Sequence, residues 1–167
     1  MGVYDARTGE LKRMVDARAP AVGFYMRIAL SPAGELLATR GPGEAVQVFR
    51  LDSSNAPVVY GSHGGTIRGL AFSSDGRFLA SASEDRTAKV WSTASGKEVL
   101  TLQGHAGKVI SIAFSPDDEL IATGSDDRTL RLWEAQTGRT LMVLTQTSVS
   151  LGSAQGIQAV AFSPDGH

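Results

Sequence analysis

The chain has 167 residues, of which 42% are hydrophobic and 20% charged, and these values are typical of one soluble globular domain. Its formal net charge is −1, whereas nucleic-acid binders usually carry a basic excess, so we expect no nucleic-acid partner. The lack of cysteine excludes disulfides and thiolate metal sites, and no apolar run approaches the ~18 residues of a membrane span. We therefore expect a cytoplasmic protein that has no membrane partner.

The middle of the chain is a sequence repeat. Residues 63–102 and 105–144 align without a gap at an offset of 42 positions, and 14 of the 40 aligned residues are identical. Self-similarity with a period of about 20–50 residues is the mark of a solenoid, propeller or array. This repeat indicates the architecture, and the other segments are assigned by their alignment to it.

The chain begins with the tail of such a repeat. Within residues 1–15, Tyr4 falls where the two strong copies have Trp91 and Trp133. The residues that follow Tyr4 predict the outer strand of a unit shared between the two ends of the chain. Residues 21–60 form a weaker repeat, in which phenylalanine replaces the tryptophan.

A polar, serine-rich connection follows the last strong copy, and residues 156–167 then restart the pattern as far as a turn. Each full repeat contains four apolar runs of four to six residues separated by short polar turns, a pattern that predicts strands. Asp75-Gly76 and Asp165-Gly166 are hairpin signals because glycine adopts positive φ without steric cost. No segment shows a sustained helical period, so we predict an all-β array of antiparallel meanders.

Both strong copies place a histidine, a hydroxyl, an aspartate and a tryptophan at the same spacing. The two sets are His63, Ser81, Asp85, Trp91 and His105, Thr123, Asp127, Trp133. A catalytic triad also uses such groups, but an active site is usually built once per domain and needs an open pocket. A set that recurs in successive units, with Thr in place of Ser, favours a structural role. In it the indole N–H, the hydroxyl, the imidazole and the carboxylate form one hydrogen-bonded chain.

These residues, together with turns of the SPDG type every ~42 residues, resemble the WD-repeat family of β-propellers, with repeats of the bacterial type. The resemblance implies four-stranded blades and a structural tetrad in each of the two strong repeats. It also implies units at 21–60, 63–102 and 105–144, with partial ones at 1–15 and 156–167. The flanking repeats depart from the pattern at Ala21, Gly43, Phe49 and Ser153.

About three full blades plus fragments fall short of the roughly four to eight blades of closed propellers. Two explanations stay open. Either the chain is a piece of a longer protein that supplies the remaining blades, which we favour, or a second copy or a partner closes the ring.

Resemblance to WD-repeat proteins implies a non-enzymatic scaffold that binds partner proteins through one face of the propeller. The alternatives are a sensor or regulatory segment of a larger signalling protein, with a kinase or ATPase on another part, and a small-molecule enzyme at the propeller channel. No cofactor and no metal site are expected, because the three histidines are too few and too dispersed for zinc. The candidate partner contacts lie in the histidine-side loops and the Asp-x-Thr turns: Thr66, Arg68, Glu84, Arg86, Lys108, Asp126 and Arg128.

Overall fold

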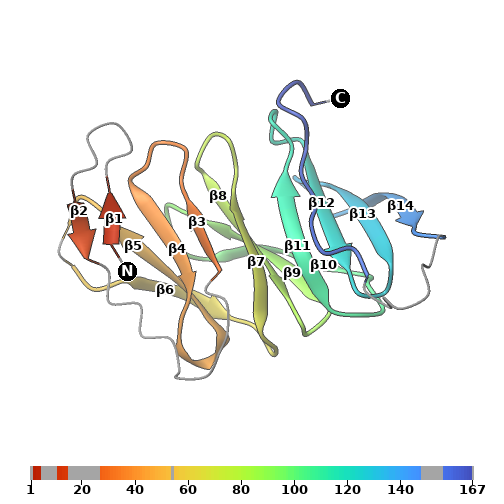
Figure 1. Cartoon of the computed structure of the whole chain (residues 1–167), viewed down its shortest axis with the longest axis horizontal. Coiled ribbons are helices and arrows are strands. Elements are labelled where there is room, and N and C mark those ends of the chain that lie inside the picture. Colours follow the sequence, from red (N-terminus) through yellow and green to blue (C-terminus); the bar gives the residue numbers. More distant parts are fainter. Residues whose placement is uncertain (1, 5–10, 15–26, 54, 148–155, 167) are drawn as a thin grey trace.

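The computed structural model describes residues 2–4, 11–14, 27–53, 55–147 and 156–166. It contains three four-stranded antiparallel sheets and one two-stranded hairpin, which succeed one another across the molecule (Figure 1). The helical structure in these ranges is one short 3-10 helix at Pro42–Glu44, and none of it is long and apolar enough to cross a membrane. The predicted all-β array of four-stranded blades is confirmed.

The three sheets are blades of consecutive strands. Blade 1 contains β3 (Ile28–Leu30), β4 (Leu36–Arg40), β5 (Ala45–Arg50) and β6 (Val58–Ser62). Blade 2 contains β7 (Ile67–Phe72), β8 (Phe78–Ser83), β9 (Thr87–Ser92) and β10 (Glu98–Gln103). Blade 3 contains β11 (Val109–Phe114), β12 (Leu120–Ser125), β13 (Thr129–Glu134) and β14 (Thr140–Thr145). The N-terminal hairpin pairs β1 (Gly2–Tyr4) with β2 (Leu11–Met14).

The turn between the first two strands of each blade follows from its SPDG-type sequence. In blade 2 the hydroxyl of Ser73 accepts a hydrogen bond from the backbone N–H of Phe78 at 2.9 Å and donates to the carboxylate of Asp75 at 2.7 Å. Gly76 then takes φ +71°, a left-handed conformation that glycine adopts without cost. In blade 3 Asp118 takes the same conformation at φ +60°, which aspartate tolerates better than most residues.

Strand pairing after the aromatic position is the same in three places. Trp91 lies opposite Glu98, Trp133 lies opposite Thr140, and Tyr4 lies opposite Leu11, seven residues further along in each case. Next to each pair the register shifts, as expected for a bulge that bends one strand. The N-terminal hairpin therefore has the backbone pairing of the last two strands of a blade.

The core lies between blades, where small residues on one sheet face large residues on the next. Between blades 2 and 3, Ala80, Ala82 and Ala88 form part of one buried cluster with Ile121 and Trp133. Between blades 1 and 2, a second cluster contains Ala38, Val46 and Val48 together with Ile67, Leu79 and Trp91. Both tryptophans are almost fully buried, so each one fixes its blade against the preceding blade.

The segment 156–166 is where the sequence predicts the start of a further blade. Residues 157–163 are not a strand, although the backbone N–H of Ile157 donates to the carbonyl of Ser125 at 2.8 Å. A strand requires a ladder partner, and the described residues contain no second strand for this unit. For the same reason Leu144 is 51% exposed, whereas its equivalent Leu102 in blade 2 is 2% exposed beneath blade 3.

Candidate interaction site

The two predicted polar sets are each brought together in the structure. In blade 2 the indole N–H of Trp91 donates to the hydroxyl of Ser81 at 2.9 Å, and this hydroxyl lies 2.7 Å from Nε2 of His63. The Nδ1 atom of His63 lies 2.9 Å from the carboxylate of Asp85. Because the Ser81 oxygen accepts from tryptophan, its own proton points to Nε2, and the imidazole proton is therefore on Nδ1.

Blade 3 repeats this geometry with threonine in place of serine. Trp133 donates to Thr123 at 2.8 Å, Thr123 lies 2.8 Å from Nε2 of His105, and Nδ1 of His105 lies 2.9 Å from Asp127. The hydroxyl-bearing residues of both sets have no exposed surface, so a substrate in solution cannot reach either hydroxyl. This burial does not favour nucleophilic catalysis.

The ionisation of these groups follows from burial and hydrogen bonding. Burial lowers the pKa of His63 and His105, and their bonds to aspartate offset only part of this effect, so both imidazoles are neutral at pH 7. Burial acts to raise the pKa of Asp85, but hydrogen bonds from the side chain and backbone of Thr87, from His63 and from Gly64 lower it to about 2. Asp127 has an equivalent set of donors, and its pKa likewise lies well below the usual range.

Blade 1 lacks a comparable set. Phe49 has no N–H to donate, and Gly43 has no carboxylate. The hydroxyl of Thr39 is buried and has no hydrogen-bond partner among the described residues. Ala21 and Ser153, the two positions expected to replace histidine in the flanking repeats, lie outside the described residues.

The Asp-x-Thr turns (84–87 and 126–129) and the histidine-side loops (63–66 and 105–108) lie at one end of the sheets, here called the turn face. Two contacts hold them together in blade 2: Gly64 N–H donates to Asp85, and Glu84 N–H donates to the carbonyl of Thr66. The middle residues, Arg86 and Arg128, take φ +72° and +68° and extend into solvent. The turn face is thus a rigid backbone that carries exposed arginines.

Of the seven candidate contact residues, the structure brings three into one ion-pair group. Glu84 pairs with Arg68 of its own blade and with Lys108 of blade 3, whose Nζ lies 3.1 Å away. Burial would raise the pKa of Glu84, but both cations outweigh it and lower the pKa. Asp126 lies apart from this group, exposed in the blade 3 turn, and its backbone N–H donates to the carbonyl of Lys108.

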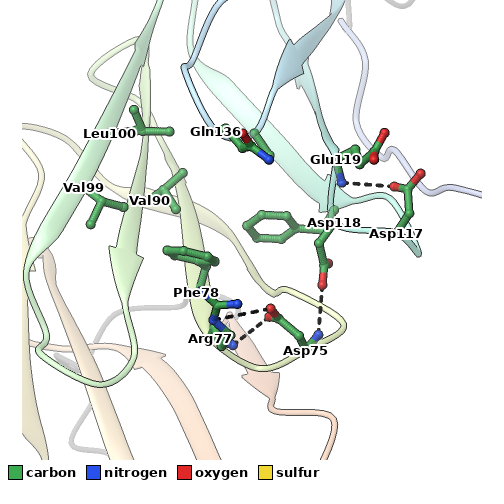
Figure 2. Close-up of a pocket in the computed structure, with 12 residues that line it drawn as sticks. Asp75, Arg77, Phe78, Val90, Val99, Leu100, Asp117, Asp118, Glu119 and Gln136 are labelled. Atoms are coloured by element: carbon green, nitrogen blue, oxygen red, sulfur yellow. Dashed lines mark hydrogen bonds and ion pairs between the residues drawn. The ribbon is translucent and has the colours of Figure 1, made fainter.

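A second feature was not predicted from the sequence. A groove of about 580 Å³ opens between blades 2 and 3 at the end opposite the turn face, and six acidic, basic or amide side chains line its polar side (Figure 2). Three of its positions break the repeat: Asp118, Glu119 and Gln136 stand where blade 2 has Gly76, Arg77 and Ala94. These differences between the two copies are the sequence signal from which the groove could have been predicted.

Among the described residues, no group of three or more His, Asp or Glu could hold a metal ion.

Comparison with known families identifies the repeats. The model described as WD domain, G-beta repeat matches residues 56–92 and 96–134. The first segment contains β6 to β9 and the second contains β10 to β13, so each family unit joins the outer strand of one blade to three strands of the next. The match does not separate bacterial-type repeats from others, and that detail stays a prediction. No curated protein matches the chain.

Proposed function

We propose that the chain is a non-enzymatic scaffold, because two of its repeats match the WD-repeat family model and proteins of that family typically mediate protein–protein interaction without catalysis. A partner protein binds the turn face, and the tetrads act as structural supports beneath that face. The observation that carries this proposal is the pair of exposed arginines, Arg86 and Arg128, at equivalent positions of adjacent blades.

Rigidity supports this assignment. Each turn is anchored by a carboxylate that accepts several hydrogen bonds at once, and Asp127 alone accepts from His105, Ala106 and both donors of Thr129. A surface ordered in this way loses little conformational entropy when a partner binds. The arginines thus present preorganised cations.

Charge supports a partner with acidic residues. Within the described part of the chain, Arg68 and Lys108 share the carboxylate of Glu84, whereas neither Arg86 nor Arg128 has an ion-pair partner. An arginine fork is suited to bidentate contact with a carboxylate. We therefore assign recognition to Arg86 and Arg128, and positioning of the adjacent loops to the Glu84 group.

The exposed apolar strand β14 supports a second part of the proposal, namely that a further blade covers this strand. Leu141, Met142, Val143 and Leu144 are each more than 40% exposed, a pattern that requires cover in the working assembly. A further blade, from a longer chain or a second copy, would bury this face as blade 3 buries Leu102. Sedimentation velocity on the chain alone distinguishes the two sources: a stable dimer favours the second copy, and a monomer favours the longer chain.

Cross-linking mass spectrometry tests the turn face. Proteins that cross-link to the intact chain are identified first, and binding of each purified candidate is then measured by calorimetry. The double variant Arg86→Glu, Arg128→Glu should weaken binding at least tenfold. Lys97→Glu makes the same kind of charge change at an exposed site at the far end of the sheets and should leave binding unchanged. Equal affinities for the two variants would reject the turn face as the contact surface.

A further inference from the structure

The groove between blades 2 and 3 is distinct from the turn face. What we infer about this groove does not rest on the proposed function. It opens between the turn that joins β7 to β8 and the turn that joins β11 to β12 (Figure 2). Its volume of about 580 Å³ is in the range of sites that enclose a ligand group. Its apolar lining comes from both blades: Phe78, Val90, Val99, Leu100, Phe114 and Ala135.

The two walls of the groove are fastened together. The carboxylate of Asp118 in blade 3 accepts hydrogen bonds from the backbone N–H groups of Ser74 and Asp75 in blade 2, at 2.7 and 2.9 Å. Figure 2 shows the contact between Asp118 and Asp75. Because both turns are held by the same carboxylate, the groove is preformed and does not need a ligand to open it.

The equivalent junction between blades 1 and 2 contains an aromatic side chain of the chain itself. Tyr60 packs against Gly96, where an added Cβ would lie 2.9 Å from the ring, and its hydroxyl donates to the carbonyl of Thr93 at 3.0 Å. At the junction between blades 2 and 3, the residue equivalent to Tyr60 is Leu102, which packs against Gly138. Thr93 corresponds at an offset of 42 to Ala135, which lines the groove. An aromatic ring therefore crosses one junction, and the other is left open.

The rim of the groove is acidic. Asp75, Asp117, Asp118 and Glu119 line it, against the single cation Arg77. Asp75, Asp117 and Asp118 each accept hydrogen bonds in the turns, but Glu119 is exposed and has no partner for its carboxylate among the described residues. At the junction between blades 1 and 2, the position of Glu119 is occupied by Arg77, so the negative rim is specific to this junction.

We propose that this groove binds a segment of a partner protein that presents one aromatic side chain between basic residues. The aromatic ring enters the apolar lining, as Tyr60 does at the preceding junction. The flanking lysine or arginine side chains pair with Glu119 and Asp117 at the rim. The site takes a short extended peptide and leaves the turn face free for a second partner.

Amide NMR shifts of the full chain test this proposal with three defined peptides: acetyl-Lys-Phe-Lys-amide, acetyl-Glu-Phe-Glu-amide and acetyl-Lys-Ala-Lys-amide. The Lys-Phe-Lys peptide should give saturable shifts at Phe78, Val90, Ala135 and Gln136, with a Kd on the order of 1 mM for so small a ligand. The Glu-Phe-Glu peptide should bind roughly three- to tenfold more weakly because of the rim charge. The Lys-Ala-Lys peptide should not saturate.

Two variants separate the apolar and the charged contributions. Ala135→Trp fills the groove and should abolish saturation by Lys-Phe-Lys, while Glu119→Arg should weaken it roughly two- to fivefold. The turn tolerates arginine there, as blade 2 shows with Arg77. If Ala135→Trp does not fold, Val99→Trp at the exposed edge of the groove replaces it.

The control is Arg86→Ala on the turn face, which should bind Lys-Phe-Lys like the parent chain. Equal binding of Lys-Ala-Lys and Lys-Phe-Lys would overturn the proposal, and so would equal binding of Glu-Phe-Glu. Shifts confined to the turn face, or an unchanged Kd in a folded groove-filling variant, would overturn it as well. None of these four outcomes decides the arginine test of the turn face, so the two proposals fail separately.

Discussion

Replacing Asp127 by alanine tests whether the blade 3 tetrad stabilises the fold. Its carboxylate accepts hydrogen bonds from His105 Nδ1, from the backbone of Ala106 and from the backbone and hydroxyl of Thr129, at 2.6–2.9 Å. Asp127→Ala removes the acceptor that these donors share, and the buried imidazole N–H keeps only the Thr129 hydroxyl, 3.1 Å away. An unsatisfied buried group costs about 1–3 kcal/mol, so the free energy of unfolding should fall by this amount.

Urea unfolding followed by tryptophan fluorescence measures this loss, and thermal melting should show a decrease of roughly 2–12 °C for a chain of this size. Asp126→Ala is the matched control, because it removes the same charge from the same turn at an exposed position. It should change the free energy of unfolding by less than about 0.5 kcal/mol. Equal losses for the two variants would refute the structural role of the tetrad.

The effect should also depend on pH. The folded-state pKa of Asp127 is lowered, so its stabilising contribution is complete above the unfolded-state value near 4 and is lost as the pH falls below it. The stability difference between the parent chain and Asp127→Ala should therefore shrink between about pH 4 and pH 2. A difference that stays constant over this range would contradict the assignment of a carboxylate-specific interaction.

Three further outcomes are expected in urea unfolding. Thr39→Val removes a buried hydroxyl without a partner, so the free energy of unfolding should stay the same or rise by up to about 1 kcal/mol. Thr123→Val removes a hydrogen-bonded hydroxyl and should lower the free energy of unfolding. Gly61→Ala places a Cβ about 2.6 Å from the ring of Trp91 and should cost about 1–3 kcal/mol. Because the folded-state pKa of both tetrad histidines is lowered, stability should begin to fall as the pH drops below about 6.5; a flat profile from pH 7 to 5 would contradict this.

Local patterns made most of the fold predictable. The 42-residue period, the apolar runs and the SPDG-type turns depend on neighbouring residues, so strands β7 to β14 could be assigned from the sequence. The spacing that relates His63 to Trp91 was visible for the same reason, because two copies at equal intervals imply equal geometry. The tail of the first repeat was also recognisable, and Tyr4 pairs with Leu11 in the register of the later repeats.

Contacts between blades could not be predicted in this way. Glu84 and Lys108 belong to different repeats, and their pairing depends on how one sheet lies beside the next. The same holds for the Asp118 carboxylate, which meets the backbone of Ser74 across the junction. No periodicity within one repeat contains that information.

The sequence alone determined which segments are strands, where the turns lie and which polar residues recur, since each depends on local conformation and a fixed repeat length. Only the tertiary structure decided which surfaces are filled. At one junction the Tyr60 hydroxyl reaches the carbonyl of Thr93 across the gap between blades, and at the next a groove with an acidic rim lies beside Ala135, the equivalent of Thr93. Side-chain volume can be read from a sequence, but whether that volume fills a space depends on what packs on its other side.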